Sequence, residues 1–159
     1  MTTNVIEFVL NPFRQTPGLC GAASLKIILE TFGISKTETE LATMSGATPE
    51  MGVPATGIVA ACSSLGLKAT IIDHAELSDI EQNLQNKKPL MVQWWLHDDG
   101  HWSPVTRIDS ENIYLQDPNL GSVRALTRET FYRNWFDFHR SVMKTENLLL
   151  RRMIVIERA

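Results

Sequence analysis

The chain has 159 residues, of which 43% are hydrophobic and 21% are charged, and its formal net charge is −3. A chain of this length and apolar content buries enough surface to offset the entropy of its backbone, so we expect one folded domain over residues 1–159. The sequence pI is about 5.8, and no run of Lys and Arg exceeds two residues, which excludes nucleic-acid binding through bulk charge. Two cysteines do not make a disulfide scaffold, so disulfide-rich secreted domains are excluded as well.

The sequence carries no recognisable targeting or membrane segment. Residues 1–7 lack a basic start, and Glu7 stands where a secretory signal needs apolar residues. The longest uncharged stretch, residues 51–67, contains Pro54 and three glycines. It is shorter than the ~18 strongly apolar residues of a membrane-spanning helix. We therefore expect a cytoplasmic protein without a membrane span.

Helical periodicity dominates the first half of the chain. After Pro17-Gly18, apolar residues recur at helical spacing until Gly33, which suits the left-handed position that ends a helix. Ser-x-x-Glu segments that begin at Ser35 and Ser78 have the pattern of a capping box and predict the starts of two more helices. The expected helices cover residues 19–32, 35–44, 54–65 and 78–86.

Strand patterns dominate the second half. The polar turn at residues 109–112 predicts a hairpin, and residues 117–121 form a second turn. Thr127 is the expected N-cap of one more helix, which carries Phe131 and Trp135. The expected strands cover residues 67–72, 90–96, 102–108, 113–116, 122–126 and 150–156. Helices followed by antiparallel strands indicate the α+β class, with N-terminal helices packed on an antiparallel sheet.

Cys20 is the first candidate for chemistry. It lies at the predicted start of the first helix, between Pro17-Gly18 and the small residues Gly21-Ala22-Ala23-Ser24. Free amide groups and the positive end of the helix dipole stabilise a thiolate at such a position. Cys62, in contrast, lies in the middle of a predicted helix and is expected to be a small core residue. We predict that Cys20 alone is a nucleophile.

A thiol nucleophile needs a base and a group that orients this base. His101 follows Gly100 at the mouth of a predicted strand, and Asp117 ends the next strand. In a hairpin of this length the two lie near each other, so the carboxylate can accept a hydrogen bond from the imidazole. Gln15 can donate its side-chain amide to an oxyanion, together with the Cys20 backbone N–H.

These residues lie within a broader pattern that resembles the C39-like branch of the papain-like cysteine peptidases. The resemblance covers roughly residues 10–140. The matching positions are Gln15, Cys20-Gly21-Ala22-Ala23-Ser24-Leu25, Gly33, Leu41, Ala60-Ala61, Leu65-Gly66-Leu67, Pro89, Gly100-His101, Asp117-Pro118, Gly121, Phe131 and Trp135-Phe136-Asp137.

The resemblance implies a papain-like fold and a bacterial-type thiol protease, a hydrolase that needs no cofactor or metal. It implies that Cys20 is the nucleophile, His101 the general base, Asp117 the residue that orients it, and Gln15 the oxyanion donor. The implied partner is a peptide or protein substrate with small residues near the cleaved bond, because leader peptidases of this family favour Gly-Gly sites. It says nothing about the oligomeric state.

Some features depart from the family and leave other functions open. Gln15 lies five residues before Cys20 instead of six, and Leu19 replaces the usual polar neighbour. Gly100-His101-Trp102-Ser103-Pro104 is similar to the Gly-His-Phe-Ser-Pro motif of phytochelatin synthases, and Cys20-Gly21-Ala22-Ala23-Ser24-Leu25 is similar to their Cys-Gly-Leu-Ala-Ser-Leu. That resemblance implies acyl transfer through a thioester. A papain-like domain that binds a peptide without cutting it is a further alternative.

Several of these residues also have simpler interpretations. His97-x-x-x-His101 with Asp98 and Asp99 is compatible with a metal site, although zinc sites usually have further Cys or His ligands. Asp117 before Pro118 is also a common turn former.

Overall fold

Six strands form one antiparallel sheet in the computed structural model, which describes residues 7–159. The strand order is β1-β8-β2-β3-β4-β5, and every neighbouring pair is antiparallel. The strands are β1 (Leu67–Ile72), β2 (Leu90–Leu96), β3 (Asp99–Ile108), β4 (Asn112–Asp117), β5 (Ser122–Thr127) and β8 (Arg152–Arg158). This arrangement confirms the α+β class.

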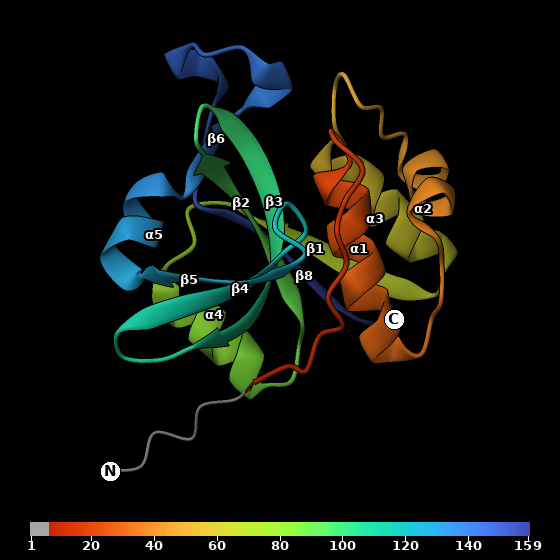
Figure 1. The fold of residues 1–159 in the computed structure, drawn as a ribbon, viewed down its shortest axis with the longest axis horizontal. Helices are drawn as coiled ribbons and strands as arrows, with labels where there is room; N and C mark the ends of the chain where they lie inside the picture. The colour runs from red at the N-terminus through yellow and green to blue at the C-terminus, as the bar shows by residue number, and fades with distance from the viewer. Residues whose placement is uncertain (1–6) are drawn as a thin grey trace.

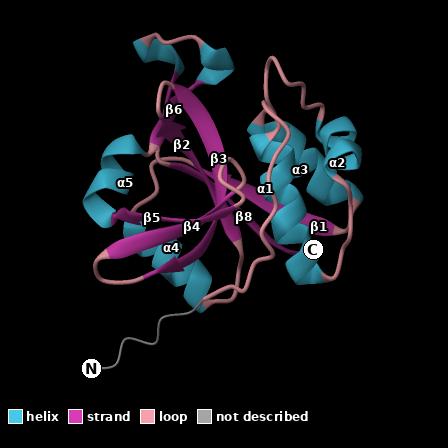
Figure 2. Ribbon diagram, in the orientation of Figure 1, coloured by secondary structure: helices cyan, strands magenta, loops and turns pink. Residues whose placement is uncertain are grey.

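The helices divide between the two faces of the sheet, as Figures 1 and 2 show. One group, at the right of both views, covers the first face, and the other group lies at the left. The first group is α1 (Cys20–Leu29), α2 (Glu38–Ser45) and α3 (Ala55–Ser64), and the second is α4 (Leu77–Gln85) and α5 (Arg128–Asn134). Among the described residues, no helix is long and apolar enough to cross a membrane.

Alternation along the central strands builds a separate core on each face. In β8, Ile154 and Ile156 pack with the α1–α3 group, whereas Met153 and Val155 pack with the α4–α5 group. Successive side chains of a strand point to opposite faces, so a continuous apolar run serves both cores. The central strands of the sheet are therefore buried between two helical layers.

Helix α1 packs closely on β3, and this packing places Cys20 beside His101 of that strand. Ser24 is fully buried, and its Oγ donates to the backbone carbonyl of Trp102 at 3.0 Å. A Cβ at Gly21 would overlap Val53 and would lie 3.3 Å from the Trp102 ring. Small residues after Cys20 therefore serve close packing of the helix on β3.

Two predicted caps are displaced by two residues. Helix α2 is capped by Thr37 instead of Ser35, with reciprocal bonds of 3.1 and 3.2 Å between Thr37 and Glu40. Glu38, the expected partner of Ser35, instead accepts the Thr16 N–H at 2.8 Å and holds the segment that leads to Cys20. In α4 the backbone N–H of Glu76 donates to Asp79 at 2.7 Å, so this helix begins before Ser78.

The expected strand at residues 150–156 is two strands instead of one. Arg151 has a φ of +47°, which interrupts the extended backbone. Its guanidinium donates from Nε to the carbonyl oxygen of Ala75 at 2.8 Å, which holds the kink in place. The part before the kink, β7 (Leu148–Leu150), pairs with β6 (Phe136–Phe138) in a separate small sheet that the sequence did not predict.

Candidate active site

Cys20 is the first residue of α1 and faces a cleft. The helix has no side-chain cap, and its first backbone bond runs from the Ala23 N–H to the carbonyl of Leu19. The N–H groups of Cys20, Gly21 and Ala22 therefore have no partner within the helix, as at any helix start. Together with the helix dipole they favour negative charge beside the Cys20 sulfur.

His101 and Asp117 form a buried pair next to this thiol. His101 Nε2 lies 2.6 Å from Asp117 Oδ1, and the two residues are 6% and 0% exposed. Because Nε2 is bound to Asp117, Nδ1 is the ring nitrogen left for Cys20, whose side chain contacts the imidazole. The structure thus brings together three of the residues that the sequence singled out.

The charge state of His101 depends on these two neighbours. Burial alone would lower the pKa of His101, but the hydrogen bonds to Asp117 and Cys20 and their negative charge outweigh it. Together they raise the pKa of His101 to about 9. The imidazole is therefore protonated at neutral pH, which fits an ion pair with a thiolate.

Asp117 is held by two further donors. Arg124 donates from Nε to Asp117 Oδ2 at 2.6 Å, and the Asn119 backbone N–H donates to Oδ1 at 2.9 Å. Burial by itself would raise the pKa of Asp117, but the His101 and Arg124 bonds keep this pKa below its ordinary value. Asp117 is therefore an ionised carboxylate that accepts from His101.

Trp94 supports the imidazole from the neighbouring strand. It lies opposite His101 in the β2–β3 ladder, and the two rings meet edge to face at 5.7 Å. Its indole N–H donates to Ser103 at 3.0 Å, and the Arg124 guanidinium lies 5.9 Å from its ring centre. Packing of this kind limits the orientations available to the His101 ring.

Gln15 lies in the same cleft, on the segment before α1. Its backbone N–H donates to the carbonyl of Pro118 at 2.8 Å, which ties this segment to the turn after Asp117. The side-chain Nε2 makes one long bond of 3.4 Å to the Thr16 carbonyl. Its Oε1 is buried and has no hydrogen-bond partner among residues 7–159.

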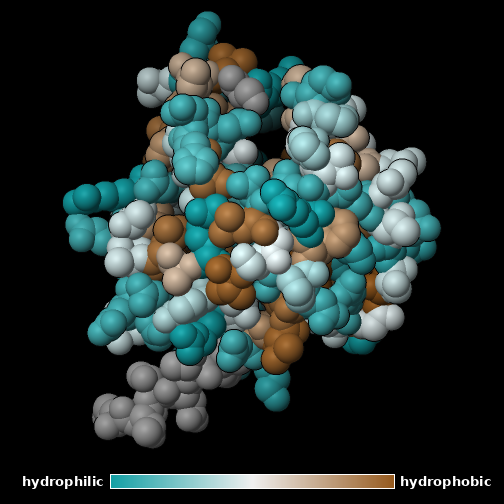
Figure 3. All heavy atoms as spheres, viewed as in Figure 1, coloured by the Kyte–Doolittle hydropathy of each residue, from teal (hydrophilic) through white to brown (hydrophobic). Residues whose placement is uncertain are grey.

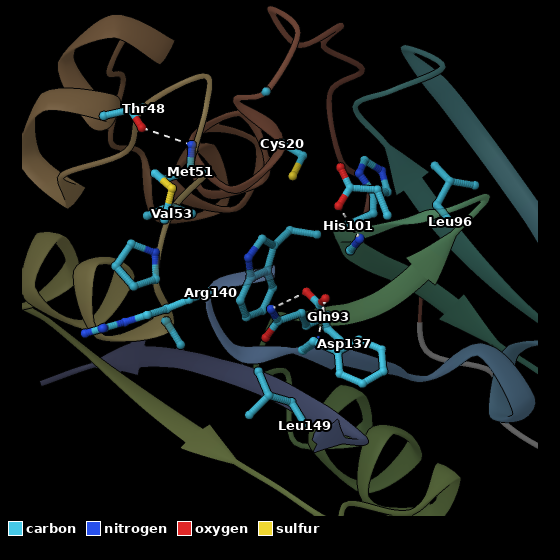
Figure 4. Close-up of a pocket in the computed structure, with 18 of the residues that line it drawn as sticks. Cys20, Thr48, Met51, Val53, Gln93, Leu96, His101, Asp137, Arg140 and Leu149 are labelled. Carbon is cyan, nitrogen blue, oxygen red and sulfur yellow. Dashed lines mark hydrogen bonds between the residues drawn. The ribbon is translucent and has the colours of Figure 1, made fainter. Parts of the chain in front are cut away.

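The cleft around these residues has a volume of about 1030 Å³. Figure 3 shows this face of the molecule hollowed at the top, between the segment after β6 and the loop before α3. Figure 4 shows Cys20 and His101 near each other, with Gln93 and Asp137 on the side toward Leu149. Residues of four stretches line much of the cleft: 14–20, 46–56, 93–102 and 137–140.

The remaining candidates from the sequence lie elsewhere. Cys62 is fully buried in α3, and burial raises the pKa of its thiol to about 12. His97 lies in the turn between β2 and β3, where it is exposed, while the His101 ring is bound to Asp117. Within the described part of the chain, no three His, Cys, Asp or Glu side chains are grouped as metal ligands.

Sequence reasoning did not single out Arg124 or Gln93 as site residues, and it noted Asp137 only as a family position. Arg124 is the single charged residue of β5, and a lone arginine in a strand is usually exposed to solvent. Its contact with Asp117 depends on the β4–β5 pairing, in which it lies opposite Leu115. The one available signal was the alternation of side chains between the two faces along β5, because it determines which side chains of this strand lie on the same face as Asp117.

Comparisons with known proteins agree with this geometry. A family model described as the peptidase C39 family matches residues 14–147. An uncharacterized protein of Methanothermobacter thermautotrophicus is 34% identical over 114 residues, which are 72% of this chain and 74% of that protein. An uncharacterized protein of Methanothermobacter marburgensis is also 34% identical, over 74% of this chain and 78% of its own length.

Solved structures share the fold at low sequence identity. The peptidase domain of Streptococcus ComA, a bifunctional ABC transporter, is similar with a TM-score of 0.71 at 20% identity, over 97% of this chain and 99% of that domain. A double glycine motif protease from an AMS/PCAT transporter, solved in complex with the leader peptide, has a TM-score of 0.72 at 16% identity, over 96% and 94%. A C39-like peptidase from Bacillus anthracis has a TM-score of 0.69 at 14% identity, over 99% of both chains. With the family model matching most of its length, this chain belongs to the peptidase C39 family.

Proposed function

We propose that the protein is a cysteine peptidase in which Cys20 is the nucleophile, His101 the general base and acid, and Asp117 the residue that orients His101. The observation that carries this proposal is the 2.6 Å bond between His101 Nε2 and the fully buried Asp117, beside a cysteine at a helix start. We further propose that residues 1–159 act as one peptidase domain. A reducing compartment such as the cytoplasm suits a nucleophile that has to remain a free thiol.

The reaction begins with the Cys20 thiolate and the His101 imidazolium. The sulfur attacks the carbonyl carbon of the substrate, and the carbonyl electron pair moves onto oxygen to give a tetrahedral oxyanion. When this intermediate collapses, the C–N bond breaks and His101 gives its proton to the leaving amine. The product of this half-reaction is a thioester on Cys20.

Water completes the cycle. His101, now neutral, accepts a proton from water as the oxygen attacks the thioester carbon, and the C–S bond then breaks. This step releases the carboxylic acid and restores the thiolate–imidazolium pair. Asp117 keeps the ring in one orientation through both half-reactions because Arg124 and Asn119 hold its carboxylate.

We propose two donors for the oxyanion. The Cys20 backbone N–H belongs to the uncapped start of α1, where a developing negative charge is favoured. Gln15 is the second donor in our proposal, because its Nε2 is engaged only in a 3.4 Å bond to Thr16 that a substrate oxygen can replace.

The substrate class in this proposal is a peptide with small residues at the cleaved bond. The AMS/PCAT protease, which shares the fold, was solved with a leader peptide bound. In this chain the segments at residues 46–56 and 137–140 flank a cleft of about 1030 Å³, large enough for several residues of an extended peptide.

The test is thiol labelling followed by mass spectrometry. Limited iodoacetamide should modify Cys20 rapidly and leave Cys62 unmodified, since Cys62 is buried with a pKa of about 12. His101→Ala should slow the labelling of Cys20 without exposing Cys62. Equal labelling of both cysteines in the folded protein would contradict the proposal.

A cleavage assay then separates the three enzyme and binding alternatives. An internally quenched peptide with a Gly-Gly pair should be cut by the wild type and not by Cys20→Ala. Incubation with glutathione that gives γ-glutamylcysteine oligomers would show acyl transfer instead of hydrolysis. Peptide binding without either product would show a domain that has lost catalysis.

A further inference from the structure

Asp137 lies directly against the residue that precedes the proposed base. It belongs to β6, and a Cβ on Gly100 would overlap both oxygens of the Asp137 carboxylate. Gly100 and Trp102 lie two residues apart in β3 and so point to the same face of the sheet, the face on which α1 packs. The Asp137 carboxylate therefore borders the cleft on the face that carries Cys20.

The carboxylate is fixed in place but not neutralised. Gln93 Nε2 donates to Asp137 Oδ2 at 2.6 Å, and the Phe138 backbone N–H donates to Oδ1 at 2.7 Å. Within the described residues, Asp137 forms no ion pair. The cation of the neighbouring strand, Arg152, is instead engaged with both oxygens of Asp73 at 2.7 and 2.9 Å.

The surroundings of Asp137 are rich in acceptors. Gln93 Oε1 is buried and has no hydrogen-bond partner among residues 7–159, although the same side chain donates to Asp137. Burial raises the pKa of Asp137, and the negative charge of Asp99, which also lines the cleft, adds to this effect, while the hydrogen bonds from Phe138 and Gln93 and the charge of Arg152 oppose it. An ionised carboxylate has about four acceptor positions, of which the protein's own donors occupy two here.

We propose that Asp137 determines substrate specificity by binding a cationic nitrogen of the substrate, either a Lys or Arg side chain or a free N-terminal amine. This inference rests on the proposed peptidase function. Charged N–H donors match a partly buried carboxylate better than neutral donors, because they supply the missing counter-charge as well as the hydrogen bond. Gln93 positions the carboxylate and offers Oε1 as a second acceptor to the same group.

The cation is expected close to the cleaved bond. Gly100 and His101 are consecutive, so their Cα atoms are about 3.8 Å apart. Asp137, Cys20 and His101 line the same cleft, and an extended peptide advances about 3.3 Å per residue, so the positions nearest the cleaved bond are the first to test. At those positions Asp137 contacts the substrate without taking part in the chemistry.

The test compares matched peptides in a cleavage assay. Acetylated, internally quenched Gly-Gly peptides carry Lys, norleucine or Glu at each of the two positions on either side of the Gly-Gly pair. At one position the wild type should prefer Lys to norleucine by about tenfold or more in kcat/KM and should disfavour Glu. A norleucine peptide that begins at that position with a free N-terminal amine tests the second source of cation. Faster cleavage of this peptide than of its acetylated form would show that an N-terminal amine is the group bound. The proposal is wrong if no position and neither source of cation shows a preference.

The variant Asp137→Asn keeps the size of the side chain and removes its charge. It should bring the ratio of Lys to norleucine turnover close to one, whereas a purely structural role would change both rates alike. Asp98→Asn, an equal change in the exposed turn beside Asp99, should keep the wild-type ratio. A preference that survives in Asp137→Asn would overturn the proposal, and the wild-type Lys–norleucine–Glu series tests it even where this variant does not fold.

A binding measurement separates this inference from the proposed function. Fluorescently labelled Lys and norleucine peptides are titrated into Cys20→Ala and into Cys20→Ala/Asp137→Asn. A charge preference in binding without cleavage by the wild type would refute the peptidase function and support the role of Asp137. Cleavage by the wild type without any charge preference would support the function and refute the role of Asp137.

Discussion

Arg124 donates from Nε to Asp117 Oδ2 at 2.6 Å, on the side of the carboxylate away from the His101 bond. The contact joins β5 to the end of β4, so the orientation of the proposed base depends on the outer strand of the sheet. Because Asp117 is fully buried, its charge is stable only with such partners. Arg124 therefore acts on the base through Asp117 without contacting the cleft.

Replacement of Arg124 should change how kcat/KM depends on pH on the acid side of its optimum. Arg124→Met removes one of the contacts that lower the pKa of Asp117, so this pKa rises and the carboxylate is lost at a higher pH. We expect kcat/KM on a Gly-Gly peptide to fall about tenfold at neutral pH and its acid limb to move upward. The kcat/KM of Arg124→Lys should lie between those of the wild type and Arg124→Met, because Lys keeps the positive charge but not the Nε geometry.

The matched control for this prediction is Arg133→Met. Arg133 forms an exposed pair with Glu129 at 2.7 Å, and it does not line the cleft. Arg133→Met should leave the pH profile of kcat/KM unchanged. An acid limb that stays in place in Arg124→Met would show that Arg124 serves only the stability of the sheet.

Asp117 itself should control the alkaline side of the profile. The His101 pKa of about 9 lies above the ordinary value of 6.5, so the ring keeps its proton through neutral pH and loses it as the pH rises through about 9. Activity should therefore decline above about pH 9. Asp117→Asn removes the bond that contributes most to raising this pKa, so the alkaline limb should move toward pH 6.5.

Asp117→Asn should also lower kcat, because Asp117 fixes the orientation of the His101 ring as well as its charge. Asn presents either an amide or a carbonyl to Nε2, and the ring no longer has one favoured state, so kcat should fall by about two orders of magnitude or more. Asp98→Asn is the control for a general loss of negative charge near the site. A full profile from pH 4 to 10 for each variant checks the prediction, and an unmoved alkaline limb in Asp117→Asn would contradict it.

The backbone pattern of the sequence was sufficient to predict much of this arrangement. The hairpin turn at residues 109–112 and the turn at 117–121 follow from polar and Gly/Pro residues, and they place His101 and Asp117 at the same end of two paired strands. Gly33 ends the first helical segment with a φ of +74°, as its position predicted.

What the sequence could not predict depends on pairing over long distances. Arg124 and Asp137 look like ordinary surface charges until the β4–β5 register and the position of β6 are known. The capping box predicted at Ser35 failed for a related reason, since Glu38 is taken by a tertiary bond to Thr16 and leaves Thr37 as the cap. The break at Arg151 depends on the Ala75 carbonyl, 76 residues away.

Ser24 should link the stability of α1 to the geometry of the site. Its Oγ bond to the Trp102 carbonyl joins the helix that starts at Cys20 to the strand that carries His101. Ser24→Ala should lower the free energy of unfolding by about 1 kcal/mol and should also reduce kcat, because the helix can shift relative to β3. Urea unfolding and cleavage assays on the same preparation measure the two effects.

A local serine bond gives the control for Ser24. Ser64 is exposed, and its Oγ donates to the Ala61 carbonyl at 2.7 Å within the same helix. Ser64→Ala removes the same kind of bond without uncoupling α1 from β3, so kcat should not change. A loss of stability in Ser24→Ala without any loss of kcat would mean that the bond supports the fold only.

Gly100 should be intolerant of a side chain for one identifiable reason. Its φ is outside the left-handed region, so Ala is compatible with the backbone, but the new Cβ would overlap the Asp137 carboxylate. Gly100→Ala should therefore lower the free energy of unfolding by about 1–3 kcal/mol and reduce kcat/KM, because Asp137 or His101 has to move. The double variant Gly100→Ala/Asp137→Ala removes the obstructing carboxylate and should recover most of the stability lost in Gly100→Ala. Urea unfolding of the four proteins in this cycle gives the coupling energy, and strictly additive effects would show that the two residues are not in contact.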